Sequence, residues 1–134
     1  MKPHLVRLIL PVLLCLGLLA PASATKPRWE SVLLNDQGLF YIDPKTIREE
    51  GERKEVLSLL DYKKTQTTAA GKPYLSIEAL VRINCRQRMA RIIHLTYYSG
   101  NMLAGEVVER QGMLQEWHDI ENGTPIQRIA RRLC

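Results

Sequence analysis

Residues 75–85 alternate between apolar and polar side chains, and this alternation restricts the chain to folds that contain a β-sheet. The apolar members fall on every second position, at Leu75, Ile77, Ala79, Val81, Ile83 and Cys85. A period of two sustained over this length predicts a strand that buries one of its faces. Because Cys85 belongs to the apolar set, its sulfur should face whichever element packs on the sheet.

Residues 124–134 change to the period of a helix. Thr124 is a suitable N-cap, Pro125 suits the first helical position, and Gln127 completes a capping-box pattern. The apolar residues of this segment are spaced as on one helical face: Ile126, Ile129, Ala130 and Leu133. A helix this short is marginal in water on its own, so it should depend on packing against the sheet.

Gly and Pro residues divide the rest of the chain into segments of strand length. We expect strands at residues 29–34, 39–43, 54–62, 75–85, 89–98 and 103–109, and a short seventh strand at 117–120. Residues 44–50 are expected to form one or two helical turns, and the polar residues 63–73 a mobile loop. The predicted fold is therefore α+β: a mainly antiparallel sheet of six or seven strands, followed by one C-terminal helix.

Arg91 conflicts with the pattern of its predicted strand. In residues 89–98 it occupies the same alternate set as the apolar residues Met89, Ile93 and Leu95. A buried arginine needs a partner, because an isolated charge is costly to remove from water. We therefore expect a strand bulge or an ion pair at Arg91.

Residues 1–24 have the features of a secretory signal peptide. A short basic region is followed by an apolar stretch at 8–19 and by the small residues Ala22-Ser23-Ala24 of a cleavage site. As a helix the apolar stretch would span ~18 Å, less than the ~30 Å of a bilayer core, so a membrane anchor is disfavoured. We expect residues 25–134 to form a single domain after cleavage, with no segment apolar enough to span a membrane.

Export also determines the expected state of the cysteines. Lipid attachment to Cys15 would require a small residue before it, whereas Leu14 stands there, so a periplasmic or secreted protein is favoured over an outer-membrane lipoprotein. Cleavage leaves Cys85 and Cys134 in an oxidising compartment, where two cysteines most simply form a disulfide. The bond would close a loop of about 50 residues, which the chain-entropy model equates with roughly 4 kcal/mol. It would tie the helix to the central strand.

The chain carries little of the chemistry that catalysis or metal binding needs. His94 and His118 are isolated from each other and from the cysteines, so we predict no metal, no cofactor and no catalytic residue. A nucleophile elbow and a Gly-rich phosphate loop are both missing from the sequence. Nucleic acid is not expected as a partner of an exported protein without a stacking motif.

Arginines are the distinctive charged residues. Removal of Lys2 and Arg7 with the leader lowers the formal net charge from +5 to +3, so the positions of the remaining charges matter more than their sum. The candidate binding residues flank the two cysteines of the predicted disulfide: Arg82, Arg86, Arg88, Arg128, Arg131 and Arg132. They form either a solvated face that acidic residues balance, or a patch that attracts acidic glycans, host proteins or the envelope surface.

A series of short motifs runs through residues 29–134. They are Phe40-Tyr41-Ile42-Asp43-Pro44-x-Thr46-Ile47, Leu59-Leu60-Asp61-Tyr62, Asn84-Cys85-Arg86, Arg91, Tyr97-Tyr98-Ser99-Gly100-Asn101-Met102, Gly105-Glu106, Trp117 and Cys134. Together they resemble the bacterial surface-adhesin protein E-like family. The resemblance implies an antiparallel sheet whose C-terminal helix is tied by a Cys85–Cys134 disulfide, and a place in a Gram-negative envelope. The founding type binds host matrix and serum proteins and is a lipoprotein, whereas this chain lacks a lipobox at Cys15.

Two functions follow from this sequence. The first is a non-catalytic exported binding module, resembling the adhesin, which engages a protein or an acidic glycan through an arginine-rich face. The alternative is a periplasmic inhibitor or envelope-maintenance protein, since small disulfide-tied β-domains suit that role. An enzyme is disfavoured, because it would require a cleft in which His94, His118 and a carboxylate converge.

Overall fold

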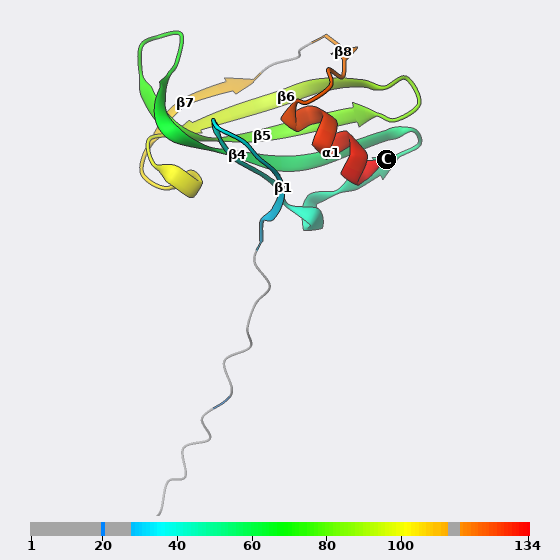
Figure 1. The fold of residues 1–134 in the computed structure, drawn as a ribbon, viewed down its shortest axis with the longest axis horizontal. Helices are drawn as coiled ribbons and strands as arrows, with labels where there is room; N and C mark the ends of the chain where they lie inside the picture. The colour runs from blue at the N-terminus through cyan, green and yellow to red at the C-terminus, as the bar shows by residue number, and fades with distance from the viewer. Residues whose placement is uncertain (1–19, 21–27, 113–115) are drawn as a thin grey trace, which may run out of the picture.

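A computed structural model describes residues 20, 28–112 and 116–134, which form one antiparallel sheet and a C-terminal helix (Figure 1). The elements in chain order are β1 (Glu30–Leu34), β2 (Gly38–Ile42), the 3-10 turn η1 (Pro44–Thr46), β3 (Arg48–Glu50), β4 (Arg53–Thr67), β5 (Pro73–Asn84), β6 (Met89–Tyr98), the 3-10 turn η2 (Asn101–Leu103), β7 (Val107–Gly112), β8 (His118–Asp119) and α1 (Pro125–Leu133). The predicted α+β architecture is confirmed. The leader expected at 1–24 lies outside the described residues, apart from residue 20.

The strands lie in the order β1-β2-β4-β5-β6-β7, with β3 paired to β4 and β8 paired to β6. The long strands β4 and β5, of 15 and 12 residues, form the middle of the sheet. The loop expected at 63–73 is shorter than predicted and covers 68–72, because β4 continues to Thr67 and pairs there with Pro73. The polar side chains of residues 63–67 are mostly exposed, and pairing with β5 resumes at Gln66 and Thr67 after an irregularity. Polarity in this segment therefore marks solvent contact and not the end of a strand.

Two further boundaries differ from the sequence prediction. Residues 44–50 do not continue as helical turns, because β3 begins at Arg48 and pairs with β4. The register places Glu49 opposite Lys54 and Glu50 opposite Arg53, and such opposite charges favour strand pairing. The strand expected at 103–109 begins only at Val107, because residues 101–103 form η2.

The core lies between α1 and one face of the sheet, and Figure 1 shows α1 crossing that face. The core residues from β5 belong to the predicted alternation: Ile77, Ala79, Val81 and Ile83. From α1, Ile129 and Leu133 are buried against them. Each fully buried side chain of this size contributes ~1.5–3 kcal/mol, so packing stabilises a helix that is too short to stand alone.

The irregularity expected at Arg91 is a strand bulge. In the pairing of β5 with β6, Leu80 is opposite His94 but Val81 is opposite Ile92, so Ile93 is an extra residue. The bulge moves Arg91 out of the alternate set of Leu95 and places it opposite Arg82. The guanidinium carbon of Arg91 lies 4.8 Å from the ring centroid of Trp117, a cation–π contact.

Candidate functional site

A disulfide joins the end of β5 to the end of α1, as predicted. Cys85 and Cys134 are bonded, with their Cα atoms 5.7 Å apart, a separation that ordinary disulfides show. The bond brings the β5–β6 turn, residues 85–88, beside the last turn of α1. We call this part of the molecule the disulfide end.

Side chains at both ends of α1 hold the helix in this position. Thr124 Oγ1 accepts a hydrogen bond from Gln127 N at 3.2 Å, which confirms the predicted N-cap. The reciprocal bond of the capping box is displaced by one residue, because Gln127 Oε1 accepts from Gly123 N at 2.7 Å. At the other end Lys54 Nζ donates to Leu133 O at 2.7 Å, so a cation satisfies a terminal carbonyl.

Three of the predicted binding arginines are neutralised by nearby carboxylates. The nitrogen–oxygen distances are 2.6 Å for Arg82–Glu55, 2.9 Å for Arg86–Glu52 and 2.7 Å for Arg132–Glu30. The hydrogen bond from Arg132 also lowers the pKa of the Glu30 carboxyl. In each pair the carboxylate holds the arginine side chain in place. It also cancels much of the positive electrostatic potential that the arginine would present to an approaching partner.

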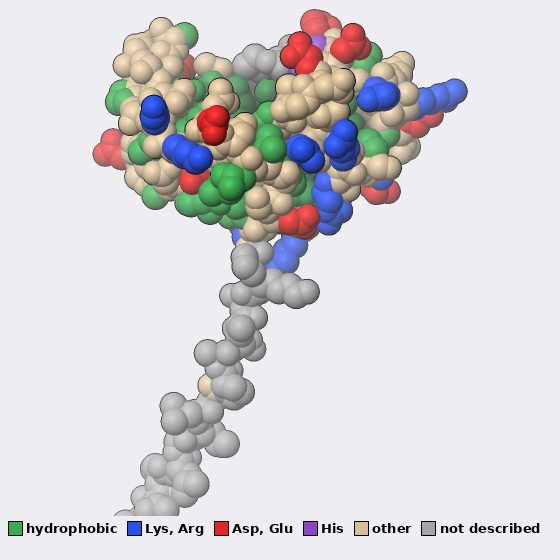
Figure 2. Space-filling model, in the orientation of Figure 1, with side chains coloured by type: hydrophobic (Ala, Val, Ile, Leu, Met, Phe, Trp, Pro, Cys, Tyr) green, Lys and Arg blue, Asp and Glu red, His purple; other side chains and the backbone are tan. Residues whose placement is uncertain are grey.

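The other three predicted arginines lack such partners in the part of the chain that the structure describes. Within residues 20, 28–112 and 116–134, no carboxylate forms an ion pair with Arg88, Arg128 or Arg131, and all three side chains are exposed. Arg128 and Arg131 are neighbours on the surface of α1 because they are three residues apart. Figure 2 shows Lys and Arg side chains gathered toward this end of the molecule. We call Arg88, Arg128 and Arg131 the unpaired-arginine patch.

Arg88 and Arg131 both line a cavity of about 270 Å³ beside the disulfide. Ile83, Ile120 and Ala130 supply the apolar part of its lining, and the two arginines supply the charged part. The disulfide therefore brings arginines from two distant segments to one cavity. Arg128 is outside the cavity lining, and Arg82, Arg86 and Arg132 are outside it as well.

Arg88 occupies a backbone conformation that non-glycine residues rarely adopt. Its φ is 54°, in the left-handed region. The Arg88 carbonyl accepts a hydrogen bond from Ile120 N at 3.3 Å, which joins the β5–β6 turn to the segment that precedes α1. The sequence did not single out Ile120, because only the tertiary structure brings it beside Arg88.

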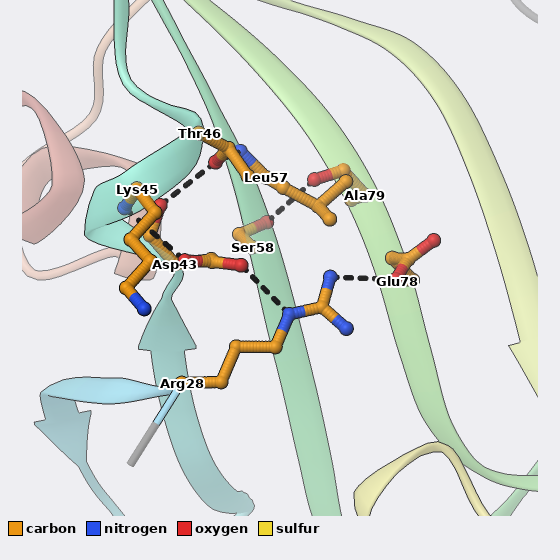
Figure 3. Close-up of polar contacts among 8 residues, drawn as sticks. All are labelled: Arg28, Asp43, Lys45, Thr46, Leu57, Ser58, Glu78 and Ala79. Carbon is orange, nitrogen blue, oxygen red and sulfur yellow. Dashed lines mark hydrogen bonds and ion pairs between the residues drawn. The ribbon is translucent and has the colours of Figure 1, made fainter. Parts of the chain in front are cut away.

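A second polar cluster, shown in Figure 3, surrounds Asp43 where the chain enters the sheet. Arg28 Nε donates to Asp43 Oδ2 at 2.7 Å, while the other oxygen of Asp43 accepts from Lys45 N at 3.1 Å. Thr46 Oγ1 donates to Asp43 O at 2.7 Å and accepts from Leu57 N at 2.9 Å. The Asp43-Pro44-x-Thr46 motif therefore builds a turn, and these contacts join it to β4 and to Arg28.

Four aromatic rings cross the sheet in a row: Phe40, Tyr62, Tyr74 and Tyr97. Successive rings meet edge to face, with centroids 4.8 to 6.4 Å apart. Burial raises the pKa of Tyr62 to about 12 and also raises the pKa values of Tyr74 and Tyr97. The row is a packing feature in which the phenols stay protonated at neutral pH.

The histidines lie on different strands of the sheet. His94 is partly buried on β6 opposite Leu80, and His118 is exposed on β8 with Nδ1 3.4 Å from Glu116 O. In the described part of the chain, no three His, Cys, Asp or Glu side chains come together as possible metal ligands. None of the helices described here has the length and apolar character needed to cross a bilayer.

These features define a class of protein: an α+β domain with one antiparallel sheet and a disulfide-bound C-terminal helix. Comparison with solved structures finds the same fold in two structures of Haemophilus influenzae protein E. One has a TM-score of 0.58 at 15% identity and covers 87% of this chain and 90% of that one. The other, from crystal form II, has a TM-score of 0.60 at 14% identity and covers 87% and 94%. A search of curated proteins found no match.

The sequence itself matches a family model. The model for surface-adhesin protein E matches residues 29–134, which include every described strand and helix. The chain therefore belongs to the surface-adhesin protein E family, as the motifs predicted. Membership supports an adhesin-like role and places the chain among exported proteins.

Proposed function

We propose that this protein is an exported, non-catalytic binding module of the adhesin type, and that it attracts an acidic partner through the unpaired-arginine patch. The partner is an acidic protein or an acidic glycan of the host matrix or of the bacterial envelope. The leader at 1–24 would direct the protein to the periplasm or the exterior. Family membership supports the adhesin-type role.

The observation that carries the proposal is the division of six arginines into two groups. Arg82, Arg86 and Arg132 each have a carboxylate within 2.9 Å. The unpaired-arginine patch has none among the described residues, so its charge acts on approaching molecules. At physiological salt the Debye length is ≈ 8 Å, so such a patch attracts a partner only over short distances and loses strength as salt is added.

A pair of double variants tests the proposal. Arg128→Gln/Arg131→Gln removes two charges from the patch, while Arg86→Gln/Arg132→Gln removes two charges that have partners. Both change the net charge equally, so a difference between them reports position alone. We expect solid-phase binding to acidic matrix and serum proteins to weaken about tenfold in the first variant and less than twofold in the second.

The salt dependence and the location of the protein complete the test. Binding should weaken as NaCl rises from 50 to 300 mM, and surface biotinylation should label the native protein on intact cells. Equal losses in both double variants, or binding that salt leaves unchanged, would contradict the proposal. Periplasmic retention together with co-purification of an envelope hydrolase would favour the inhibitor alternative instead.

A further inference from the structure

The cavity beside the disulfide combines two chemical features that one ligand group can satisfy together. Two arginines, Arg88 and Arg131, are among its lining residues, and Ile83, Ile120 and Ala130 contribute apolar side chains. The two cations come from different elements, the β5–β6 turn and α1. A ligand with a carboxylate directly next to an apolar group would match both features.

The polar side chains at the cavity favour a carboxylate over a polyhydroxylated ligand. Asn84 Nδ2 donates to Gln87 Oε1 at 3.0 Å, and Asn84 Oδ1 accepts from Gln87 N at 3.0 Å. Gln127 donates to Asn122 Oδ1 at 2.6 Å and accepts from Gly123 N at 2.7 Å. Both amides already have internal partners, so a sugar ring would find few groups for its hydroxyls. The two guanidinium groups, which bind carboxylates well, have no carboxylate partner among the described residues.

The size of the cavity limits how much of a ligand it can hold. Its volume of about 270 Å³ falls just below the ≈ 300–1,000 Å³ of pockets that enclose drug-sized molecules. It therefore suits one residue of a partner and not an extended segment. A chain terminus fits this limit, because its last residue carries the carboxylate and the side chain on the same carbon.

The backbone conformation of Arg88 also supports a binding site at the cavity. A left-handed conformation at a non-glycine residue costs of order 1–2 kcal/mol, and such residues concentrate at functional sites. Here the φ of 54° places an arginine at the cavity, and the hydrogen bond from Ile120 N holds its carbonyl. A glycine would relieve the strain but would remove the guanidinium.

We infer that this cavity binds the free C-terminal carboxylate of a partner polypeptide that ends in an apolar residue. Arg88 and Arg131 bind the carboxylate, and Ile83, Ile120 and Ala130 contact the terminal side chain. The inference rests on the proposed function, since it names the group that two members of the unpaired-arginine patch, Arg88 and Arg131, recognise. It also selects a protein partner over an acidic glycan.

A short synthetic peptide tests the inference. N-acetyl-Gly-Gly-Leu with a free carboxylate is titrated into the exported protein, purified with its disulfide intact, and binding is followed by NMR chemical-shift changes. The matched probe is the same peptide with a C-terminal amide. We expect the acid to bind at least tenfold more tightly than the amide, with shifts at Arg88, Ile120 and Ala130.

Variants on the same helix supply the internal control. Arg131→Gln and Arg88→Gly should each weaken binding of the acid about five- to tenfold, whereas Arg128→Gln should leave it within twofold. Arg88→Gly accepts the left-handed φ without strain, so a loss of binding there reports the guanidinium and not a damaged turn. Equal binding of acid and amide, or an equal loss in Arg128→Gln, overturns the inference.

The remaining outcomes separate this inference from the proposed function. Tighter binding of N-acetylneuraminic or glucuronic acid than of the peptide overturns the choice of a chain terminus. If the peptide fails to bind but acidic proteins still bind through Arg128 and Arg131, the cavity inference is wrong and the proposed function stands. If neither binds, both are wrong.

Discussion

The two ends of the central strand β5 use their polar groups in opposite ways. At the disulfide end, Arg88 and Arg131 line a cavity without carboxylate partners in the described chain. At the other end, which we call the η2 end, Asp61 accepts from Asn101 Nδ2 at 3.0 Å and from Met102 N at 2.7 Å. There the side chains bind one another.

The η2 end also contains residues in the left-handed backbone conformation, but hydrogen bonds within the protein stabilise them. Met102 and Leu103 have φ values of 53° and 62°. Ser76 Oγ donates to Gly100 O at 2.6 Å and accepts from Leu103 N at 2.9 Å, so the loop is fixed to β5. A left-handed residue or a polar cluster alone therefore does not mark a binding site. The disulfide end differs because Arg88 and Arg131 line an open cavity and have no carboxylate partner within residues 28–112 and 116–134.

The largest expected effect is loss of the disulfide. The double variant Cys85→Ser/Cys134→Ser should lower the free energy of unfolding by roughly 4 kcal/mol, because the unfolded chain regains the entropy that the bond removes. Urea denaturation measures the change, and the wild-type protein in reductant should match the variant. An unchanged midpoint in the variant would show that α1 docks by packing alone. Non-reducing peptide mapping should show Cys85 joined to Cys134.

Ser76→Ala removes the hydrogen bonds that fix the η2 loop to β5, and it should destabilise the protein less than loss of the disulfide. Removal of the hydroxyl leaves Leu103 N and Gly100 O without their partner, so we expect a loss of about 2 kcal/mol in the free energy of unfolding. The exposed residue Ser31 provides the control, and Ser31→Ala should change stability by less than about 0.5 kcal/mol. Binding of the acidic partner should be unaffected by Ser76→Ala. A loss of binding would mean that the η2 end takes part in recognition.

Alkaline pH should destabilise the aromatic row near the η2 end. The pKa of Tyr62 is about 12 in the folded protein, above the ordinary value of ≈ 10 that applies in the unfolded chain. The folded state therefore holds the phenolic proton more tightly, and its contribution is complete below pH 10 and is lost as pH rises to 12. After allowance for the exposed part of the ring, we expect a loss of about 1 kcal/mol.

The measurement is a series of urea unfolding curves between pH 9 and 12. Tyr62→Phe should flatten the alkaline decrease, because phenylalanine has no proton to lose. Tyr41→Phe is the matched control, since Tyr41 is outside the row. Stability that rises above pH 10 in the wild type would contradict the assigned direction of the shift.

The smallest expected effect on the free energy of unfolding is an increase and not a decrease. Arg88→Gly should raise the free energy of unfolding by about 0.5–1 kcal/mol, because glycine tolerates the left-handed conformation that arginine adopts there. The same variant should bind the acidic partner less well, so stability and binding would change in opposite directions. Thermal unfolding measures the first, and the peptide titration measures the second. A variant that loses stability would show that Arg88 has a structural role.

Local patterns accounted for those parts of the fold that depend on neighbouring residues. The alternation in β5 and the spacing of Ile129 and Leu133 identified core positions that the structure buries. The conflict at Arg91 predicted a bulge or an ion pair, and the structure contains the bulge. These features could be predicted because burial repeats with the period of the element itself.

Other features depend on which strands become neighbours. β3 pairs with β4 in a register that places opposite charges across from each other, and the end of β4 pairs with the start of β5 at Pro73. Arg28 binds Asp43, 15 residues along the chain, and its interaction was not predicted. No local pattern contains these contacts, because they follow from the register between segments that are distant in sequence.

The sequence by itself determined the class of fold, the terminal helix and its disulfide, because periodicity, caps and paired cysteines are local or are limited to few choices. It also identified the arginines around the bridge as candidates. Only the tertiary structure separated Arg82, Arg86 and Arg132 from Arg88, Arg128 and Arg131, because the partner of a charge is decided by the residues that folding brings within a few ångströms. The net positive charge is modest, but the arginines without a carboxylate partner in the described chain lie at the disulfide end, where a partner can bind them.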